Sequence, residues 1–207
     1  AGTNRINIHT IRKATEGFAE YIKENGSEAM NKGIAIGYDN RHHSREFAFD
    51  SANVLARNGI RVYVFESLRP TPELSFLTRF KGCFGGIMIT ASHNPGEYNG
   101  YKLYDEKGCQ LVPHLADAVT AKVNAVEDEL SVLADVPEEN KALISVVGEE
   151  IDKEYFKAVE SIQLNKDVNR DLIKIVFSPE HGTSNIPVRT ILTECGYHVT
   201  PVLEQCE

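Results

Sequence analysis

The chain alternates between segments in which apolar residues recur every three or four positions and short runs that are apolar throughout. The first pattern is typical of amphipathic helices, and the second is typical of buried strands. The predicted helices are residues 8–24, 44–58, 73–80, 113–126, 152–162 and 186–194. The predicted strands are residues 34–38, 60–65, 84–90, 101–104, 173–177 and 198–203. Strand and helix alternate, which favours an α/β sheet.

Turn-forming and capping residues support several of these boundaries. Asn25-Gly26 is expected to end the first helix, and Gly196 is expected to end the last one. Ser44 is the predicted N-cap of its helix, and Gly59 follows the C-terminal end of that helix.

The segment 127–150 separates two parts of the chain. It is acidic, contains Pro137, and suits a connector or a peripheral helix more than a core element. We therefore predict two domains, residues 1–149 and residues 150–207. The second holds one strand-helix-strand unit, which would leave most of its sheet face uncovered, so we expect this domain to be incomplete. The first domain begins with a helix and no preceding strand, which either a truncated domain or a flexible N-terminus would explain.

Composition indicates a folded protein and limits its partners. Apolar residues make up 42% and charged residues 25%, so a sizeable core can form. The net charge of −8 and the lack of a basic run argue against nucleic acid, although a local cationic pocket can still bind an anion. Four scattered cysteines without a CxxC pair predict reduced thiols in the cytoplasm. No apolar stretch is long enough to span a bilayer, and we expect no membrane partner.

The most informative segment is residues 90–95, Thr-Ala-Ser-His-Asn-Pro, which leaves a predicted apolar strand. Ligands of α/β folds bind beyond the carboxyl ends of strands, so this loop is well placed to meet a substrate. Four side chains here can bind a phosphate group: the hydroxyl of Ser92, the imidazole of His93, the amide of Asn94 and the ammonium of Lys102. A phosphorylated hydroxyl needs nearby cations, and Lys102 supplies one.

The residues in and around this loop decide between other interpretations of it. Adjacent residues of an extended strand point to opposite sides, so His93 is expected to contact the substrate and not to deprotonate Ser92. Ser92 alone would fit an ordinary turn, and a serine hydrolase would require a G-x-S-x-G elbow that is absent. Gly85-Gly86 lacks the spacing of a dinucleotide site. The interpretation therefore depends on the complete string of residues.

The string resembles the signature of the α-D-phosphohexomutases, the family of phosphoglucomutases and phosphomannomutases. That signature is a T-x-S-H-N-P loop followed by N-G-x-K, matched here by residues 90–95 and 99–102. Residues 37–41 with Ser44 resemble the family's G-x-D-x-R-x-x-S segment, and residues 178–183 are similar to the opening of its second domain. The resemblance covers nearly the whole chain and is greatest to the bacterial phosphoglucomutase branch.

The resemblance implies a three-layer domain with a mixed, largely parallel sheet between helices, followed by the start of a second similar α/β domain. It implies an intramolecular phosphotransferase that interconverts hexose 1-phosphate and hexose 6-phosphate through a phosphoserine at Ser92 and a bisphosphate intermediate. His93 and Lys102 would assist catalysis, and Arg41 and Asn94 would bind substrate. An arginine that follows a strand is equally often a surface charge or an ion-pair partner, and this alternative for Arg41 stays open. Glucose 1,6-bisphosphate would be the activator and intermediate. Mg²⁺ would be held by the phosphoserine and three aspartates of a D-G-D-x-D-R loop.

Several parts of the family pattern do not occur in this sequence. The aspartate loop, the sugar-reading G-E-x-S-G loop, the R-x-S-G-T phosphate loop and the F-G-T-x-G-x-R-G string are all absent. We therefore expect a fragment that is inactive alone and whose partners are the missing C-terminal domains of the same chain. The sugar stays open among glucose, mannose and pentose phosphates. The alternative is a non-catalytic anion-binding or interaction module, in which Ser92 never carries phosphate.

Overall fold

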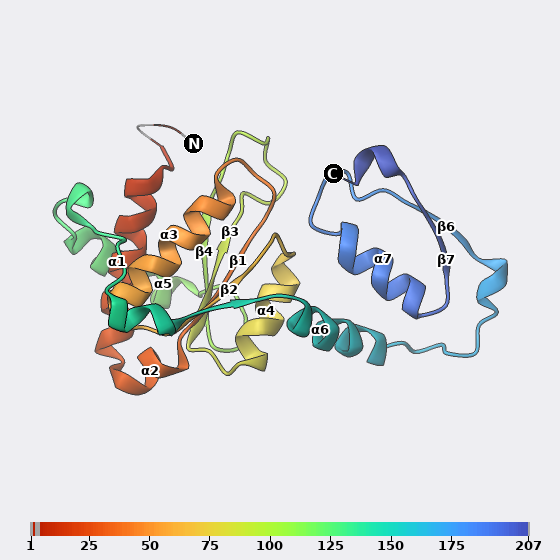
Figure 1. Ribbon diagram of the computed structural model, residues 1–207, viewed down its shortest axis with the longest axis horizontal. Helices are drawn as coiled ribbons and strands as arrows, with labels where there is room; N and C mark the ends of the chain where they lie inside the picture. Colours follow the sequence, from red (N-terminus) through yellow and green to blue (C-terminus); the bar gives the residue numbers. More distant parts are fainter. Residues whose placement is uncertain (1, 3–4, 207) are drawn as a thin grey trace. The chain divides into compact units, whose positions relative to one another are not determined.

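A computed structural model describes residue 2 and residues 5–206, which form two compact units that divide after Val147. The strands of the first unit are β1 (Ile34–Tyr38), β2 (Val62–Phe65), β3 (Gly85–Ile89), β4 (Tyr101–Tyr104) and β5 (Ile144–Val147). They form one sheet in the order β4-β3-β1-β2-β5 (Figure 1). Only the β3–β4 pair of this described sheet is antiparallel. The predicted mixed, largely parallel sheet is therefore confirmed.

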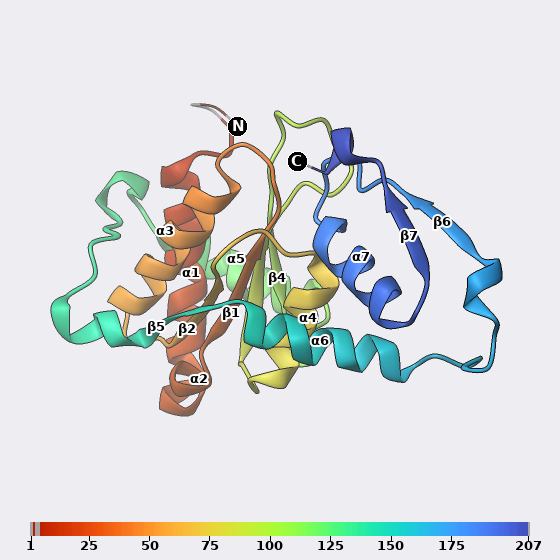
Figure 2. The same ribbon diagram turned by 45° about the vertical axis from the view of Figure 1, so that its right-hand side comes forward.

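Helices cover both faces of this sheet, which gives the unit three layers (Figure 2). They are α1 (Ile8–Glu24), α2 (Gly26–Lys32), α3 (Ser44–Arg57), α4 (Thr71–Phe80) and α5 (Pro113–Ala125). α1 packs against both α3 and α5 on one face, and α4 packs on β1 and β3 from the other face. The predicted three-layer α/β arrangement is confirmed. The short helix α2 was not predicted, because its seven residues carry no clear apolar stripe.

The core of the first unit lies between the sheet and its helices. β1 and β3 are buried at every position, as continuous apolar runs predict for parallel strands covered on both faces. Ile36 and Ile87 of the sheet pack with Phe18 and Leu55 of the helices, and none of these side chains is more than 2% exposed. Each such burial contributes about 1.5–3 kcal/mol to folding. The two strands are therefore held firmly, and their carboxyl ends form a rigid edge.

The helix ends include one error of the sequence analysis. Ser44 is not the N-cap of α3, because the cap is His43, with a φ of +65°, and Ser44 is the first helical residue. The Ser44 hydroxyl donates to Asp39 Oδ1 at 2.7 Å and accepts from Asn99 Nδ2 at 2.9 Å, so it bonds two loop side chains and caps no backbone N–H of the helix. The predicted stops at Gly59 and Gly196 are confirmed, with φ of +77° and +86° at the two glycines.

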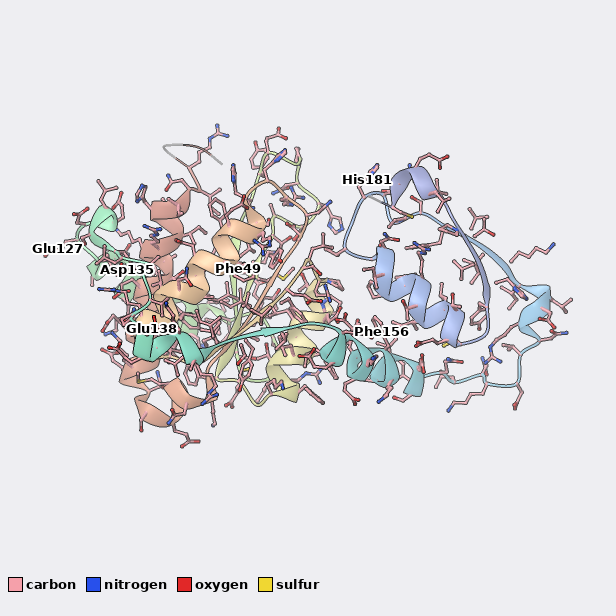
Figure 3. The ribbon with its side chains drawn as sticks, in the orientation of Figure 1. Phe49, Glu127, Asp135, Glu138, Phe156 and His181 are labelled. Carbon is pink, nitrogen blue, oxygen red and sulfur yellow. The ribbon has the colours of Figure 1, made fainter. Side chains whose placement is uncertain are left out.

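The segment after α5 contains a strand that the sequence analysis missed. Two 3-10 helices, Glu129–Ser131 and Glu138–Leu143, lead into β5, which pairs in parallel with β2 at the sheet edge. The prediction of a connector over 127–150 is therefore wrong for its last part. β5 has four residues, and Val146 is 57% exposed, so it lacks the continuous burial of the central strands. Figure 3 shows three acidic side chains of this segment at the outer side of the unit, Glu127, Asp135 and Glu138.

The second unit contains a strand-helix-strand element preceded by a helix. Its elements are α6 (Glu149–Ser161), the 3-10 helix Arg170–Leu172, β6 (Lys174–Phe177), α7 (Asn185–Glu194), β7 (His198–Pro201) and the 3-10 helix Leu203–Gln205. β6 and β7 pair in parallel, and α7 packs on β7 and α6, which confirms the predicted unit. Val176 of β6 is 75% exposed, so one face of this two-stranded sheet is open. Across residue 2 and residues 5–206, no helix has the length and apolarity that a membrane crossing requires.

Candidate active site

The loops that follow β1 and β3 meet at one edge of the sheet. The two strands are parallel neighbours with Tyr38 opposite Ile89, so the chain leaves both strands at the same place. Asp39 N–H donates to Ile89 O at 3.2 Å and joins the two loops at their start. Figure 2 shows both loops beyond the carboxyl ends of these strands. This is the edge at which α/β sheets bind ligands.

Ser92 lies in a tight turn and not in an extended strand. β3 ends at Ile89, and Ser92 has a φ of +55°, in the left-handed region. Its N–H donates to Thr90 Oγ1 at 2.9 Å, and Asn94 N–H donates to Ala91 O at 3.1 Å. A left-handed backbone costs a non-glycine residue about 1–2 kcal/mol, so the surrounding hydrogen bonds must hold it. The turn leaves Ser92 exposed.

Lys102 reaches Ser92 from the neighbouring strand. β4 runs antiparallel to β3, and Lys102 lies opposite Met88, near the end of β3 that leads into the turn. Lys102 Nζ donates to Ser92 Oγ at 2.6 Å. The structure therefore brings together the predicted hydroxyl and the predicted ammonium. A cation at this distance would offset much of the charge that a phosphate on Ser92 introduces.

His93 and Asn94 follow Ser92 on the same turn, and both are exposed. The premise that Ser92 and His93 alternate along an extended strand is wrong, because Ser92 has a left-handed backbone. Asn94 is held by its carbonyl oxygen, which accepts a hydrogen bond from Arg41 Nη2 at 2.6 Å. Substrate contacts by His93 and Asn94 stay predictions.

Arg41 lies where the two loops meet and binds the backbone of the serine turn. Its guanidinium donates to the carbonyl oxygens of Ser92, Asn94 and Pro95, each at 2.6 Å. Its Nε donates to Asp39 Oδ2 at 3.1 Å. These contacts brace the loop, and a contact between Arg41 and substrate stays a prediction.

Three residues that were not among the predicted site residues complete the junction. Asp39 Oδ1 accepts hydrogen bonds from Arg41 N–H at 3.0 Å and from Ser44 Oγ at 2.7 Å. Asn99 Nδ2 donates to Ser44 Oγ at 2.9 Å and to His42 O at 3.1 Å. A signal was present, because Asp39, Ser44 and Asn99 all stand at fixed positions of the quoted motifs.

A hydroxyl network anchors β4 beside Lys102. Tyr101 OH and Thr15 Oγ1 are 3.1 Å apart, and Thr15 Oγ1 also lies 3.2 Å from Ser51 Oγ. Burial raises the pKa of Tyr101 well above its ordinary value, so the phenol stays protonated. The network ties the start of β4 to α1 and α3.

The described residues do not by themselves fit a Mg²⁺ ion, which prefers several oxygen ligands. Within residue 2 and residues 5–206, no group of three or more His, Cys, Asp or Glu side chains is arranged to hold a metal. Asp39, the carboxylate at this junction, is bonded to Arg41 and Ser44. A phosphate on Ser92 is the ligand that this chain would offer, and further ligands would have to come from elsewhere.

Sequence comparisons identify relatives across the whole chain. Residues 1–130 match the family model of phosphoglucomutase/phosphomannomutase, alpha/beta/alpha domain I. The phosphoglucomutase of Staphylococcus saprophyticus is 37% identical over 201 residues, which are 95% of this chain and 35% of that protein. The phosphoglucomutase of Staphylococcus epidermidis is 36% identical over 208 residues, with coverage of 100% and 37%. The chain thus spans little more than a third of the length of these curated relatives.

Solved structures show a similar fold. A Thermus thermophilus protein assigned as a phosphomannomutase has a TM-score of 0.76 and 23% identity, over 99% of this chain and 44% of that one. A phosphoglucomutase/phosphomannomutase family protein from Burkholderia thailandensis has a TM-score of 0.71 and 16% identity, over 98% and 41%. At these identities the likeness concerns the fold alone.

The family model covers more than half of the chain, and it includes both loops of the site. The sequence relatives are bacterial phosphoglucomutases, which is the branch that the chain was expected to resemble most. The chain belongs to the phosphoglucomutase/phosphomannomutase family.

Proposed function

We propose that this chain supplies the phosphate-carrying serine of a mutase that interconverts hexose 1-phosphate and hexose 6-phosphate. The observation that carries the proposal is the 2.6 Å contact between Lys102 Nζ and Ser92 Oγ on an exposed turn. Ser92 is exposed, and in this proposal the Lys102 ammonium stabilises a phosphate bound to it. Family membership supports the same chemistry.

The proposed reaction consists of two phosphoryl transfers. Phosphoserine at Ser92 passes its phosphoryl group to the free hydroxyl of a hexose phosphate. The P–O bond to Ser92 Oγ breaks while a P–O bond to the sugar oxygen forms, and the sugar hydroxyl loses a proton while Ser92 Oγ gains one. The hexose bisphosphate then turns around and returns its other phosphoryl group to Ser92. Phosphate is conserved, so the net reaction is an isomerisation.

The residues around Ser92 take distinct roles in this proposal. The Lys102 ammonium offsets charge on the transferring group, which is where electrostatic stabilisation has its largest effect. In this proposal the sugar phosphate is contacted by His93 and Asn94, which are both exposed beside Ser92.

We further propose that the complete reaction takes place in a longer protein of which this chain is an N-terminal part. The relatives are nearly three times as long, and the aspartate and sugar-reading loops are not in this sequence. Mg²⁺ would be bound with those loops, and glucose 1,6-bisphosphate would be the intermediate that loads Ser92. Glucose phosphate is the first substrate to test, and the scattered thiols favour the cytoplasm.

The test is phosphopeptide mass spectrometry after incubation with glucose 1,6-bisphosphate and Mg²⁺. The 207-residue chain and the longer protein are each tested as wild type and as the Ser92→Ala variant. The control in both is Ser131→Ala, which changes an exposed serine of the connector. We expect phosphate on Ser92 in the longer protein, little on the shorter chain, and no effect of Ser131→Ala. Absence of phosphate at Ser92 in both proteins would refute the proposal and favour a non-catalytic anion-binding or interaction module.

A further inference from the structure

Carbonyl oxygens of the serine turn converge on the guanidinium of Arg41. Its Nη2 donates to Ser92 O and Asn94 O, both at 2.6 Å. Its Nη1 donates to Pro95 O at 2.6 Å and to Tyr98 O at 3.3 Å. The two terminal nitrogens of a guanidinium carry four N–H groups in total. These four bonds therefore use all of them.

The remaining N–H of Arg41 is used as well. Nε donates to Asp39 Oδ2 at 3.1 Å, and the Arg41 side chain is only 10% exposed. Asp39 is in turn fixed by Ser44, whose hydroxyl also accepts a hydrogen bond from Asn99. The guanidinium thus has no free donor for a substrate phosphate, and it links the serine turn to the end of β1 and the start of α3.

The turn needs such a link for two physical reasons. Ser92 holds a left-handed backbone that a serine does not favour by itself. The carbonyl oxygens of Ser92, Asn94 and Pro95 are directed at one point, where their partial negative charges repel one another unless a cation lies between them. Without Arg41 the turn would relax, and Ser92 Oγ would leave its position beside Lys102.

We propose that Arg41 is a positioning residue, which holds the turn of Ser92 in the conformation from which phosphoryl transfer occurs and does not bind the substrate. The inference rests on the proposed mutase function and replaces the sequence-based expectation of a substrate-binding arginine. Because Arg41 acts through the backbone of the turn, its loss changes the rate of transfer and leaves the affinity for sugar phosphate unchanged.

Steady-state kinetics of the longer protein test this role with Arg41→Ala and Arg41→Lys. A displacement of reacting atoms by about 1 Å costs on the order of 100-fold, so we expect kcat to fall about 100-fold in Arg41→Ala. The KM for glucose 1-phosphate should stay within about twofold of the wild-type value. The kcat of Arg41→Lys should be little higher than that of Arg41→Ala, because a single ammonium cannot reach all the carbonyl oxygens that the planar guanidinium contacts through its two terminal nitrogens. Added guanidinium ion should restore part of the rate in Arg41→Ala and none in Arg41→Lys.

Arg57→Ala is the matched control. Arg57 also bonds a carbonyl and a carboxylate, both of Asp135, but it is the half-buried last residue of α3 and does not contact the serine turn. We expect wild-type kcat and KM for this variant. A tenfold or larger rise in KM with kcat retained in Arg41→Ala would show that Arg41 binds substrate and would overturn the inference. Wild-type kinetics in Arg41→Ala would overturn it equally.

Hydrogen exchange of the 207-residue chain separates failure of this inference from failure of the proposed function. The backbone N–H groups of Ser92, Asn94 and Tyr98 are hydrogen-bonded within the turn. We expect peptides that cover residues 90–100 to exchange at least tenfold faster in Arg41→Ala, with unchanged exchange in α1 as the measure of intact folding. Unchanged exchange at residues 90–100 would refute the brace even if Ser92 is phosphorylated. Faster exchange in a protein whose Ser92 never accepts phosphate would refute the mutase proposal and leave the brace in place.

Discussion

Replacement of Lys102 by Ala removes the cation next to Ser92 without disturbing the turn that presents it. The Lys102 ammonium contacts Ser92 Oγ at 2.6 Å, whereas the backbone of the turn is held by Arg41. β4 is anchored by Tyr101, whose hydroxyl is bonded to Thr15. The substitution therefore tests the electrostatic contribution of one side chain to the loading of Ser92 with phosphate.

The size of the effect follows from the separation of the two charges. An ammonium and a phosphate about 4 Å apart attract each other by roughly 1 kcal/mol in water and roughly 4 kcal/mol at an effective dielectric constant of 20. Ser92 is exposed and Lys102 is half-buried, so a value of about 2 kcal/mol is reasonable. Before the reaction Ser92 carries no phosphate, so the attraction between Lys102 and the phosphate is absent from the free enzyme and present in the transition state. All of it therefore contributes to the second-order rate constant of phosphorylation. This corresponds to about a 30-fold loss of rate.

The assay is single-turnover phosphorylation of Ser92 by glucose 1,6-bisphosphate in the longer protein, followed by quenching and intact mass. Lys102→Arg keeps the charge and should retain most of the rate, and Lys107→Ala removes an exposed lysine beyond β4 and should have no effect. The loss in Lys102→Ala should shrink at high salt, because salt screens charges on an exposed turn. A Lys102→Ala rate within about threefold of wild type would refute the electrostatic argument.

Three further predictions concern the fold. Gly33→Ala should destabilise the first unit by about 2 kcal/mol or more in urea unfolding, because Gly33 has a φ of +74° and a Cβ would lie 2.4 Å from Arg61 O. Phe18→Ala should cost about 3–5 kcal/mol in the same assay, because Phe18 is 2% exposed in the core; a loss below 1 kcal/mol would contradict the packing. Burial raises the pKa of Cys83 from near 9 to about 12, so iodoacetamide at pH 8 should alkylate exposed Cys109 and spare Cys83. Between about pH 9 and pH 12 the Cys83 thiol stays protonated in the folded chain and ionises in the unfolded chain. The contribution of buried Cys83 to the free energy of unfolding is therefore complete below about pH 9 and is lost as the pH rises toward 12.

The sequence was sufficient for the central elements of the fold. β1 and β3 lie in continuous apolar runs, and such runs are typical of strands covered on both faces. β5 was missed because an edge strand of four residues with an exposed Val146 lacks that pattern. The error at Ser44 has a different cause, because its hydroxyl bonds Asp39 and Asn99, and only the folded loops show which groups lie within its reach.

The candidate site was predicted in its residues but not in its geometry. Ser92 and Lys102 were expected to cooperate, and they are in contact. The left-handed backbone of Ser92 could not be predicted, because serine rarely adopts it and several of the bonds that hold it come from a distant part of the chain. Arg41 illustrates this, since its partners in the turn lie more than fifty residues further along the chain. Local sequence patterns do not report such pairings.

The antiparallel pairing of β3 with β4 makes the register of Lys102 within β4 a constraint in its own right. Lys102 lies opposite Met88, and side chains alternate between the two faces of a strand. Insertion of one residue into β4 before Lys102 would turn the ammonium to the opposite face, away from Ser92, while every chemical group of the site remained present. The hairpin should therefore tolerate conservative substitutions far better than insertions or deletions, whereas the exposed connector around Asp135 should accept changes in length.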